Sequence, residues 1–311
     1  MYKPLTSLFC LLIFSISLRG ETLNSFSYAV GESKSNYFDP ESSGVASVIR
    51  PLSRRLDYSR QIGEDWLASV SFEKVKGDGQ WFSGFLRVNS FYNKASSRSH
   101  TWQASLVWFD DDIDWSVSFA KLRTQDESLF FLPEIKEKLT RNDQLFNFSV
   151  GKTLEFNDEF SNSLWTLDWS VGTQFAALDV HLIDQVELST PIEVDAYFKQ
   201  QSWTGFVDFS LNYWQVESSV IWGPYLILSW NSELQLSGDL SVTLSNEQRN
   251  ISLDEAGSRY SQAFRTPDSG RWEMGWQFLF DSGFSFNFSY AKDVATASDF
   301  DFIEAVVGFS F

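Results

Sequence analysis

Residues 284–290 read Phe-Ser-Phe-Asn-Phe-Ser-Tyr, an alternation of aromatic and small polar side chains. Successive side chains of a β-strand point to opposite faces, so this stretch predicts a strand with one aromatic face and one polar face. The same period of two recurs along the chain, for example at 66–73, 113–119, 165–171 and 272–280. After residue 20 there is no long helical stripe and no apolar run long enough for a membrane helix.

The two faces differ from those of a soluble β-sandwich. The apolar face is rich in Trp and Phe, often near strand ends, and the polar face is mostly Ser, Asn, Thr, Gly and Asp. Soluble strands usually present longer charged side chains to water. Small polar side chains suit a barrel interior, and Trp and Tyr near strand ends suit the two interfaces of a membrane. The pattern predicts an all-β fold, a transmembrane antiparallel up-and-down β-barrel, with a soluble β-sandwich as the alternative.

Turn-forming segments divide the chain into about 14 expected strands: 23–30, 64–74, 80–91, 101–109, 113–122, 144–155, 163–173, 185–197, 203–214, 219–230, 234–245, 271–280, 284–292 and 300–311. Bacterial barrels have short periplasmic turns and longer outer loops. We expect short turns at 76–79, 110–112, 231–233 and 281–283, and long loops at 31–63, 92–100, 123–143 and 247–270. A barrel of 12 strands, without 23–30 and 185–197, is the alternative.

The composition excludes several classes of protein. Aromatic residues make up 17% of the 311 residues, far more than a disordered chain carries. Lys and Arg number 24 against 41 Asp and Glu, and this acidity argues against a nucleic-acid partner. One Cys and two His leave too few ligands for a Cys/His zinc site, and no Gly-rich phosphate loop occurs. We expect no metal and no cofactor.

The first 20 residues have the features of a secretory signal peptide. Lys3 provides the positive start, 5–18 is apolar, and Gly20 is a small residue at the expected cut. The segment is short for a membrane span, and an N-terminal helical anchor is the alternative. Cys10 lacks a small residue before it, so we expect no lipidation. We expect 1–20 to be removed after export and 21–311 to form one barrel domain.

The end of the chain carries the most specific local signal. Residues 303–311 read Ile-Glu-Ala-Val-Val-Gly-Phe-Ser-Phe and alternate up to the terminal Phe311. This resembles the C-terminal signature of Gram-negative outer-membrane β-barrel proteins, and names no subfamily. The resemblance implies that barrel-assembly machinery recognises the last strand, with Phe309 and Phe311 as the assembly signal. It also implies a location in the bacterial outer membrane, in contact with lipid and lipopolysaccharide.

The two histidines are the candidates for catalysis. His181 follows Asp179 by two residues, a spacing similar to that of the outer-membrane proteases called omptins, and on a strand the two side chains share a face. Such a protease also needs a second acidic pair, and the spacing of neither 126–127 nor 254–255 singles it out. His100 lies among serines in an expected loop, so pairing it with one Ser is uninformative. We expect no catalytic residues and no enzyme.

The polar faces carry an excess of acids. The expected lumen-facing acids are Glu73, Asp114, Asp168, Asp208, Asp239, Glu273 and Glu304, and Arg87 is the base expected to oppose them. Carboxylates around a lumen favour cations. The sequence therefore predicts a porin-like channel for passive passage of small solutes, with a cation-leaning lumen. The alternatives are a non-conducting structural or surface-interaction barrel and an autotransporter-type translocator barrel.

Overall fold

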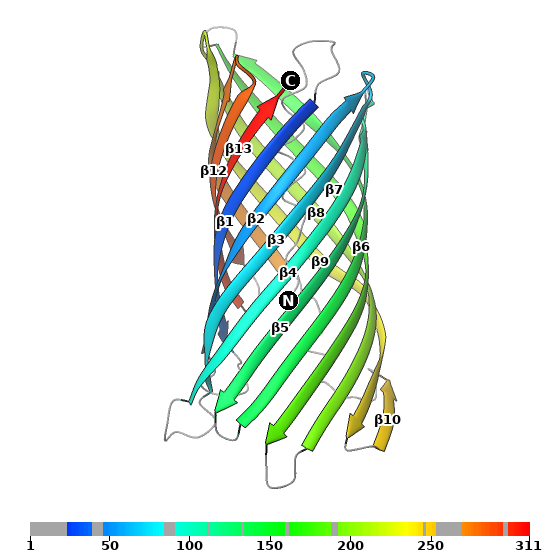
Figure 1. The fold of residues 1–311 in the computed structure, drawn as a ribbon. Coiled ribbons are helices and arrows are strands. Elements are labelled where there is room, and N and C mark those ends of the chain that lie inside the picture. The colour runs from blue at the N-terminus through cyan, green and yellow to red at the C-terminus, as the bar shows by residue number, and fades with distance from the viewer. Residues whose placement is uncertain are drawn as a thin grey trace.

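The computed structural model folds the chain into a closed antiparallel β-barrel (Figure 1). The structure describes residues 24–38, 46–83, 91–110, 112–131, 134–158, 162–187, 192–244, 247–252, 269–294 and 298–311. The expected signal peptide at 1–20 lies outside the described residues, so its presence and removal stay predictions.

Every described strand pairs antiparallel with its neighbours. The strands are β1 (Asn24–Phe38), β2 (Ala46–Ile62), β3 (Trp66–Ser83), β4 (Phe91–Trp108), β5 (Asp114–Phe131), β6 (Glu134–Asp158), β7 (Ser163–Glu187), β8 (Ile192–Val216), β9 (Val220–Leu244), β10 (Glu247–Ser252), β11 (Ser269–Phe280), β12 (Phe284–Val294) and β13 (Ser298–Ser310). The first strand, β1, pairs with the last, β13, and closes the barrel.

The barrel has 12 strands around its circumference, because β10 and β11 share one position. Both pair with the same edge of β9, β10 along 239–244 and β11 along 220–231. The expected all-β antiparallel barrel is therefore confirmed, the main expectation of 14 strands is wrong, and the alternative of 12 is right.

The structure has fewer strands than expected because several strands continue past expected connections. The expected connections at 75–79, 198–202 and 231–233 lie inside the continuous strands β3, β8 and β9. The expected loop at 31–63 instead contains part of β1 and all of β2. Joining these segments removes three of the expected strands, and β2 adds one, so the 14 expected strands become 12. The segments 23–30 and 185–197, which the 12-strand alternative leaves out, both contain strand residues. The expected loops at 92–100 and 123–143 likewise belong largely to β4, β5 and β6.

The start of β1, the end of β13 and the short turns lie at one end of the barrel. Asn24 and Phe311 exchange two backbone hydrogen bonds, of 2.9 and 2.8 Å. The expected connections at 110–112 and 281–283 join β4 to β5 and β11 to β12 at this end. In the second, Gly283 has a φ of 82°, and an added Cβ would lie 2.3 Å from the Ser310 carbonyl oxygen, so this tight turn needs glycine.

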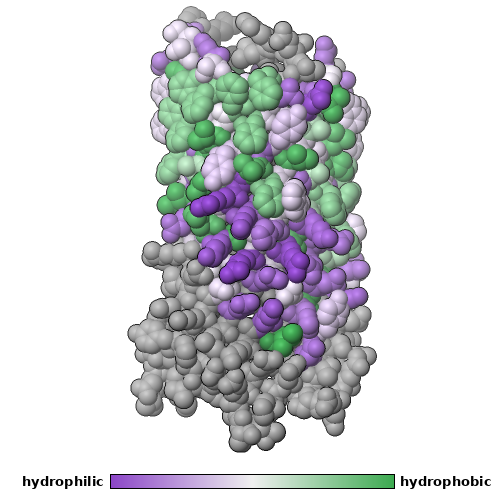
Figure 2. Space-filling view, in the orientation of Figure 1, coloured by the Kyte–Doolittle hydropathy of each residue, from purple (hydrophilic) through white to green (hydrophobic). Residues whose placement is uncertain are grey.

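Towards the other end the strands extend well beyond a membrane. Strands β6 to β9 are 25 residues long each, whereas a tilted strand crosses a bilayer with about 9–11 residues. The outward faces carry large exposed apolar side chains near the short turns, including Phe26, Trp66, Trp115, Phe156, Trp165, Trp276 and Phe309. Figure 2 shows this apolar band, with strongly hydrophilic surface below it. The described residues contain no helix long and apolar enough to cross a membrane.

Candidate functional site

The inner face of the barrel is the candidate site, because alternate residues place polar side chains there. Trp276 is 43% exposed on the outside, whereas its neighbour Gln277 is 7% exposed. Among the described residues, seven charged side chains are buried: Arg55, Asp57, Asp143, Asp208, Arg271, Glu273 and Glu304. Burying a charge is costly unless the charge is paired and hydrogen-bonded, so the contacts of these groups show how the interior compensates each charge.

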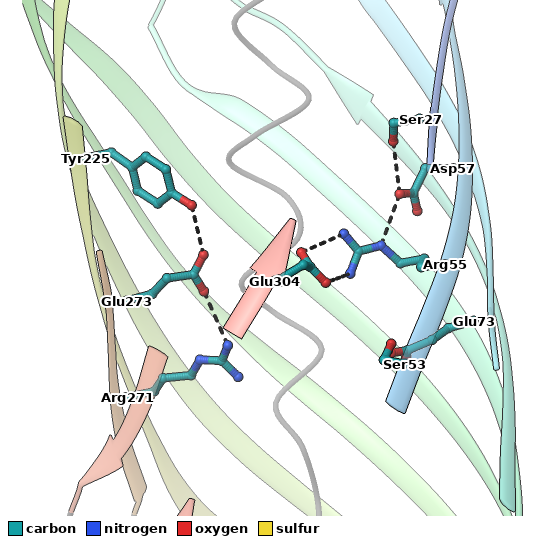
Figure 3. Close-up of polar contacts among 9 residues, drawn as sticks. All are labelled: Ser27, Ser53, Arg55, Asp57, Glu73, Tyr225, Arg271, Glu273 and Glu304. Atoms are coloured by element: carbon teal, nitrogen blue, oxygen red, sulfur yellow. Dashed lines mark hydrogen bonds and ion pairs between the residues drawn. The ribbon is translucent and has the colours of Figure 1, made fainter. Parts of the chain in front are cut away.

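Arg55 is the centre of the first interior cluster. Its Nη1 and Nη2 atoms donate to the two carboxylate oxygens of Glu304 at 3.0 and 3.1 Å, and its Nε atom donates to Asp57 Oδ2 at 3.0 Å. Ser53 Oγ donates to Glu73 in the same cluster. Since β1 lies between β2 and β13, the guanidinium group reaches across β1 to hold β13 (Figure 3). This bidentate geometry is the strongest form of an Arg–carboxylate contact.

The strand that Arg55 spans has a glycine at this level. Gly31 pairs with Ser53 on one side and with Glu304 on the other. A Cβ on Gly31 would lie 2.5 Å from Phe302 Cζ, so the Phe302 ring occupies the space that a side chain would need. The Phe302 ring also lies 5.7 Å from the Arg271 guanidinium carbon, within range of a cation–π contact.

Arg271 belongs to a second cluster on the neighbouring strands. Its Nη2 atom donates to Glu273 Oε2 at 3.2 Å, and Tyr225 Oη donates to Glu273 Oε1 at 3.1 Å. Tyr225 Oη also lies 3.3 Å from Asn287 Oδ1. We call the two clusters together the interior belt: Ser53, Arg55, Asp57, Glu73, Tyr225, Arg271, Glu273 and Glu304 (Figure 3).

The carboxylates on β7 and β8 have different surroundings. Asp168 accepts hydrogen bonds from Thr153 Oγ1 at 2.6 Å and Asn212 Nδ2 at 2.9 Å. Asp208 is 6% exposed and accepts a long hydrogen bond of 3.4 Å from Ser170 Oγ. These donors are neutral, whereas Arg55 and Arg271, the buried guanidinium groups in the described part of the chain, both lie in the interior belt. The interior wall is therefore electrostatically uneven.

Farther from the short turns the interior becomes partly apolar. Ala120, Leu145, Ala176 and Leu178 form a buried cluster. Asp143 lies on the inner face beside this cluster and accepts a hydrogen bond from Arg141 Nε. Burial raises the pKa of the Asp143 carboxyl group, and Arg141 opposes this shift. The outward neighbour of Asp143, Gln144, is exposed and polar, which places this level beyond the apolar band.

The structure distributes the acids expected in the lumen over three places. Glu73, Glu273 and Glu304 lie in the interior belt, and Asp168 and Asp208 lie on β7 and β8. Asp114 is half-buried at the start of β5, near the short turns. Asp239 pairs with Lys199 in the backbone register of β9, and its side chain lies outside the described part of the structure. Arg87 also lies outside the described residues. That these acids select permeating ions stays a prediction.

Three charged members of the interior belt were missed by the sequence. Arg55 and Asp57 fell in the expected loop at 31–63, so no face was assigned to them. Arg271 opens the expected strand at 271–280 two residues before Glu273, and the period of two places both on one face. The same alternation therefore predicts that Arg271 faces the lumen together with Glu273.

The histidines do not form the pair that the sequence suggested. His181 Nε2 lies 2.7 Å from Asp195 Oδ1 on the neighbouring strand, and the two side chains are 41% and 47% exposed. His100 stacks on Phe72 at 6.3 Å between ring centroids. Among the described side chains, no group of three or more His, Cys, Asp or Glu is placed to hold a metal ion. The expectation that the protein is not an enzyme stays a prediction.

Comparison with known proteins identifies the class of fold. No protein-family model and no curated protein sequence matches the chain. The translocator domain of the autotransporter NalP from Neisseria meningitidis matches with a TM-score of 0.66 and 10% identity over 96% of this chain and 91% of that chain. The β-domain of the Bordetella autotransporter BrkA matches with a TM-score of 0.57 and 11% identity over 94% and 100%. The transport unit of the autotransporter AIDA-I from Escherichia coli matches with a TM-score of 0.55 and 13% identity over 97% of this chain and 94% of that chain.

These likenesses concern the fold. The closed antiparallel barrel, its apolar outer band and its structural neighbours are those of outer-membrane β-barrels, which confirms the class inferred from the alternation and the C-terminal strand. Phe309 and Phe311 are 47% and 65% exposed, and their rings stack at 6.1 Å on the outer surface. Their role as an assembly signal stays a prediction.

Proposed function

We propose that this barrel lets small hydrated solutes pass across the outer membrane and that it favours cations. The observation that carries the proposal is the charge of the interior. Among the residues that the structure describes, the buried charged side chains comprise five carboxylates and two guanidinium groups, an excess of acid on the inner face. A lumen lined with carboxylates attracts cations, and low-dielectric walls strengthen the field.

The uneven wall gives the proposal a more specific form. In the interior belt, Arg55 and Arg271 each hold a carboxylate within 3.2 Å, so much of the local negative charge is compensated. Asp168 and Asp208 receive hydrogen bonds from neutral groups, which add no compensating positive charge. We therefore assign the larger share of cation preference to the wall formed by β7 and β8.

The test is a reversal potential in a planar lipid bilayer under a KCl gradient. We expect cation preference in the wild type, a lower preference in Asp208→Asn, and no change in Glu32→Gln, which removes an exposed acid on the outer face of β1. The preference is expected to be larger at low salt, because the Debye length is about 8 Å at physiological ionic strength. An anion-selective pore contradicts the charge argument. A folded barrel that conducts nothing favours a structural or surface-interaction role.

A translocator barrel is the second candidate, favoured by the fold shared with three autotransporter domains. At about 10% identity the likeness concerns the fold alone, so it supports a function less directly than the charges of the interior do. The discriminating experiment places an epitope before Asn24 and asks whether antibody reaches it on intact cells. Display of the epitope at the cell surface supports the translocator. An epitope that stays inaccessible in a folded, conducting barrel supports the channel.

A further inference from the structure

A group of basic side chains occupies the outer surface of β2 to β5, immediately beyond the apolar band. All are exposed, and we call them the basic patch: Arg54, Lys74, Lys76, Arg98, His100, Lys121 and Arg123. The face shown in Figure 2 carries strongly hydrophilic surface at this level. The whole chain has a net charge of −17, so a gathering of bases on one face calls for a physical reason.

The strand register places these side chains directly beside one another. Arg54 pairs with Lys74, Lys74 pairs with His100, and His100 pairs with Arg123, which makes one row across four strands. In the next outward row, Lys76 pairs with Arg98. Arg54 and Lys74, and likewise Lys76 and Arg98, are like charges directly opposite each other, an arrangement that destabilises a sheet. An anionic partner that spans several strands converts this repulsion into binding.

The described acids on this outer surface lie at the margins of the basic patch. Glu32 on β1 pairs with Leu52 and Ile303, and Glu127 on β5 pairs with Ser96 and Lys138. Neither residue pairs with a member of the central row. Within the described side chains, no acid lies opposite a member of the row in the strand register, so an anion from outside the barrel wall can meet these charges.

The position of the basic patch relative to the apolar band indicates where that anion lies. In the direction away from the short turns, Arg54 lies two residues beyond the exposed Leu56 on the outer face of β2, and Lys121 lies two residues beyond the exposed Phe119 on β5. Two residues of a strand span about 7 Å, so the charges lie at the depth of lipid headgroups. Short turns are periplasmic in this class of barrel, and the patch lies on the side away from them, at the outer leaflet.

We propose that the basic patch binds the phosphate groups of a phosphorylated glycolipid of the lipopolysaccharide type in the outer leaflet. Arg54 and Arg123 are separated by three strand spacings, about 14 Å, which leaves room for two phosphate groups. Arginine contacts phosphate through paired N–H groups, and lysine adds a compact positive charge. The exposed Trp102 and Phe119 beside the row provide apolar surface for the acyl chains of the same lipid. The proposal needs the outer-membrane barrel and is independent of ion passage.

The first experiment measures binding of diphosphorylated lipid A by native mass spectrometry after the folded barrel is stripped of lipid. The triple variant Arg54→Gln, Lys74→Gln, Arg123→Gln is compared with the control Arg60→Gln, Lys138→Gln, Lys199→Gln, which removes three exposed bases elsewhere on the outer face. Each charge near a membrane surface contributes about fivefold, so we expect roughly 100-fold weaker binding in the patch variant and less than about threefold change in the control.

Two further arms test the chemistry. A dephosphorylated glycolipid is expected to bind the wild type and the patch variant equally, and inorganic phosphate at millimolar concentration is expected not to displace lipid A. Equal binding of lipid A by both triple variants overturns the proposal, and so does displacement by free phosphate. Heat-modifiable migration on gels shows that each variant is folded.

The second experiment uses the wild type alone and therefore does not depend on folding of a variant. Amine acetylation is followed by peptide mass spectrometry in vesicles with and without lipid A. We expect Lys74, Lys76 and Lys121 to be protected at least threefold by lipid A, with Lys138 and Lys199 reacting equally in both. Uniform protection, or none, contradicts a phosphate site on β2 to β5.

Discussion

Replacing Arg55 with glutamine tests whether the interior belt stabilises the closed barrel. Arg55 holds Glu304 through two hydrogen bonds of 3.0 and 3.1 Å and Asp57 through one of 3.0 Å, and all three side chains are buried. Arg55→Gln leaves two buried carboxylates without their cation. Breaking a buried pair by removing one partner costs about 3–5 kcal/mol, so we expect the free energy of unfolding to fall by that amount.

The assay is urea unfolding in vesicles of zwitterionic lipid, followed by tryptophan fluorescence and by gel migration. Arg54→Gln is the matched control, because the adjacent side chain faces outward and is exposed. We expect Arg54→Gln to change stability by less than about 0.5 kcal/mol, as surface substitutions do. Adding Glu304→Gln to Arg55→Gln is expected to recover part of the loss. A loss below about 1 kcal/mol for Arg55→Gln refutes the view that the interior belt fastens β13 to β2 across β1.

Three further predictions use the outer face, the last residue and one turn. Phe288 faces lipid and is 48% exposed, and Phe288→Arg is expected to cost about 2–4 kcal/mol if the residue lies near the midplane. Phe284→Arg, nearer the short turns, is expected to cost about 0–1 kcal/mol. Urea unfolding in vesicles measures both costs, and the reverse order contradicts the depth assignment. Deleting Phe311 removes the two backbone hydrogen bonds to Asn24, so we expect a lower yield of folded barrel with unchanged export. Heat-modifiable migration of outer-membrane fractions measures the yield, and an unchanged yield contradicts a role in assembly. Gly283→Ala is expected to destabilise the barrel by more than 1 kcal/mol, because its φ of 82° disfavours a side chain and the new Cβ meets Ser310; wild-type stability in urea contradicts this.

The alternation was informative wherever one face of a strand meets lipid. Residues 284–290 lie in β12 as expected, and the exposed Phe288 and buried Asn287 occupy the expected faces. The contrast fails where the strands leave the membrane, because both faces then carry polar side chains. For that reason the sequence of β2, with Arg54, Arg55 and Asp57, predicts a loop, and the most highly charged part of the interior does not emerge from the alternation.

A second limit is a local irregularity in pairing. Trp203 pairs with Gln235 while Thr204 pairs with Glu233, so Leu234 is left out of the register and is 64% exposed. This β-bulge changes which residues of β9 share a face on its two sides. Before the bulge the exposed residues are even-numbered, such as Leu228 and Trp230, whereas beyond it the odd-numbered Gln235 and Ser237 are exposed. Extending either alternation therefore does not give the face of Asp239.

The interior belt and the basic patch depend on the same register, because they use adjacent residues of β2. Arg54 faces outward in the row with Lys74, and Arg55 faces inward against Glu304. A slip of one residue exchanges the two faces of a strand, so it would place Arg55 outside and leave Glu304 buried without its partner. The bidentate contact of Arg55 thus selects the register that aligns Arg54 with Lys74, His100 and Arg123. If the phosphate proposal holds, a variant that loosens the interior contact should also weaken lipid A binding at the outer surface, although it removes no outward charge.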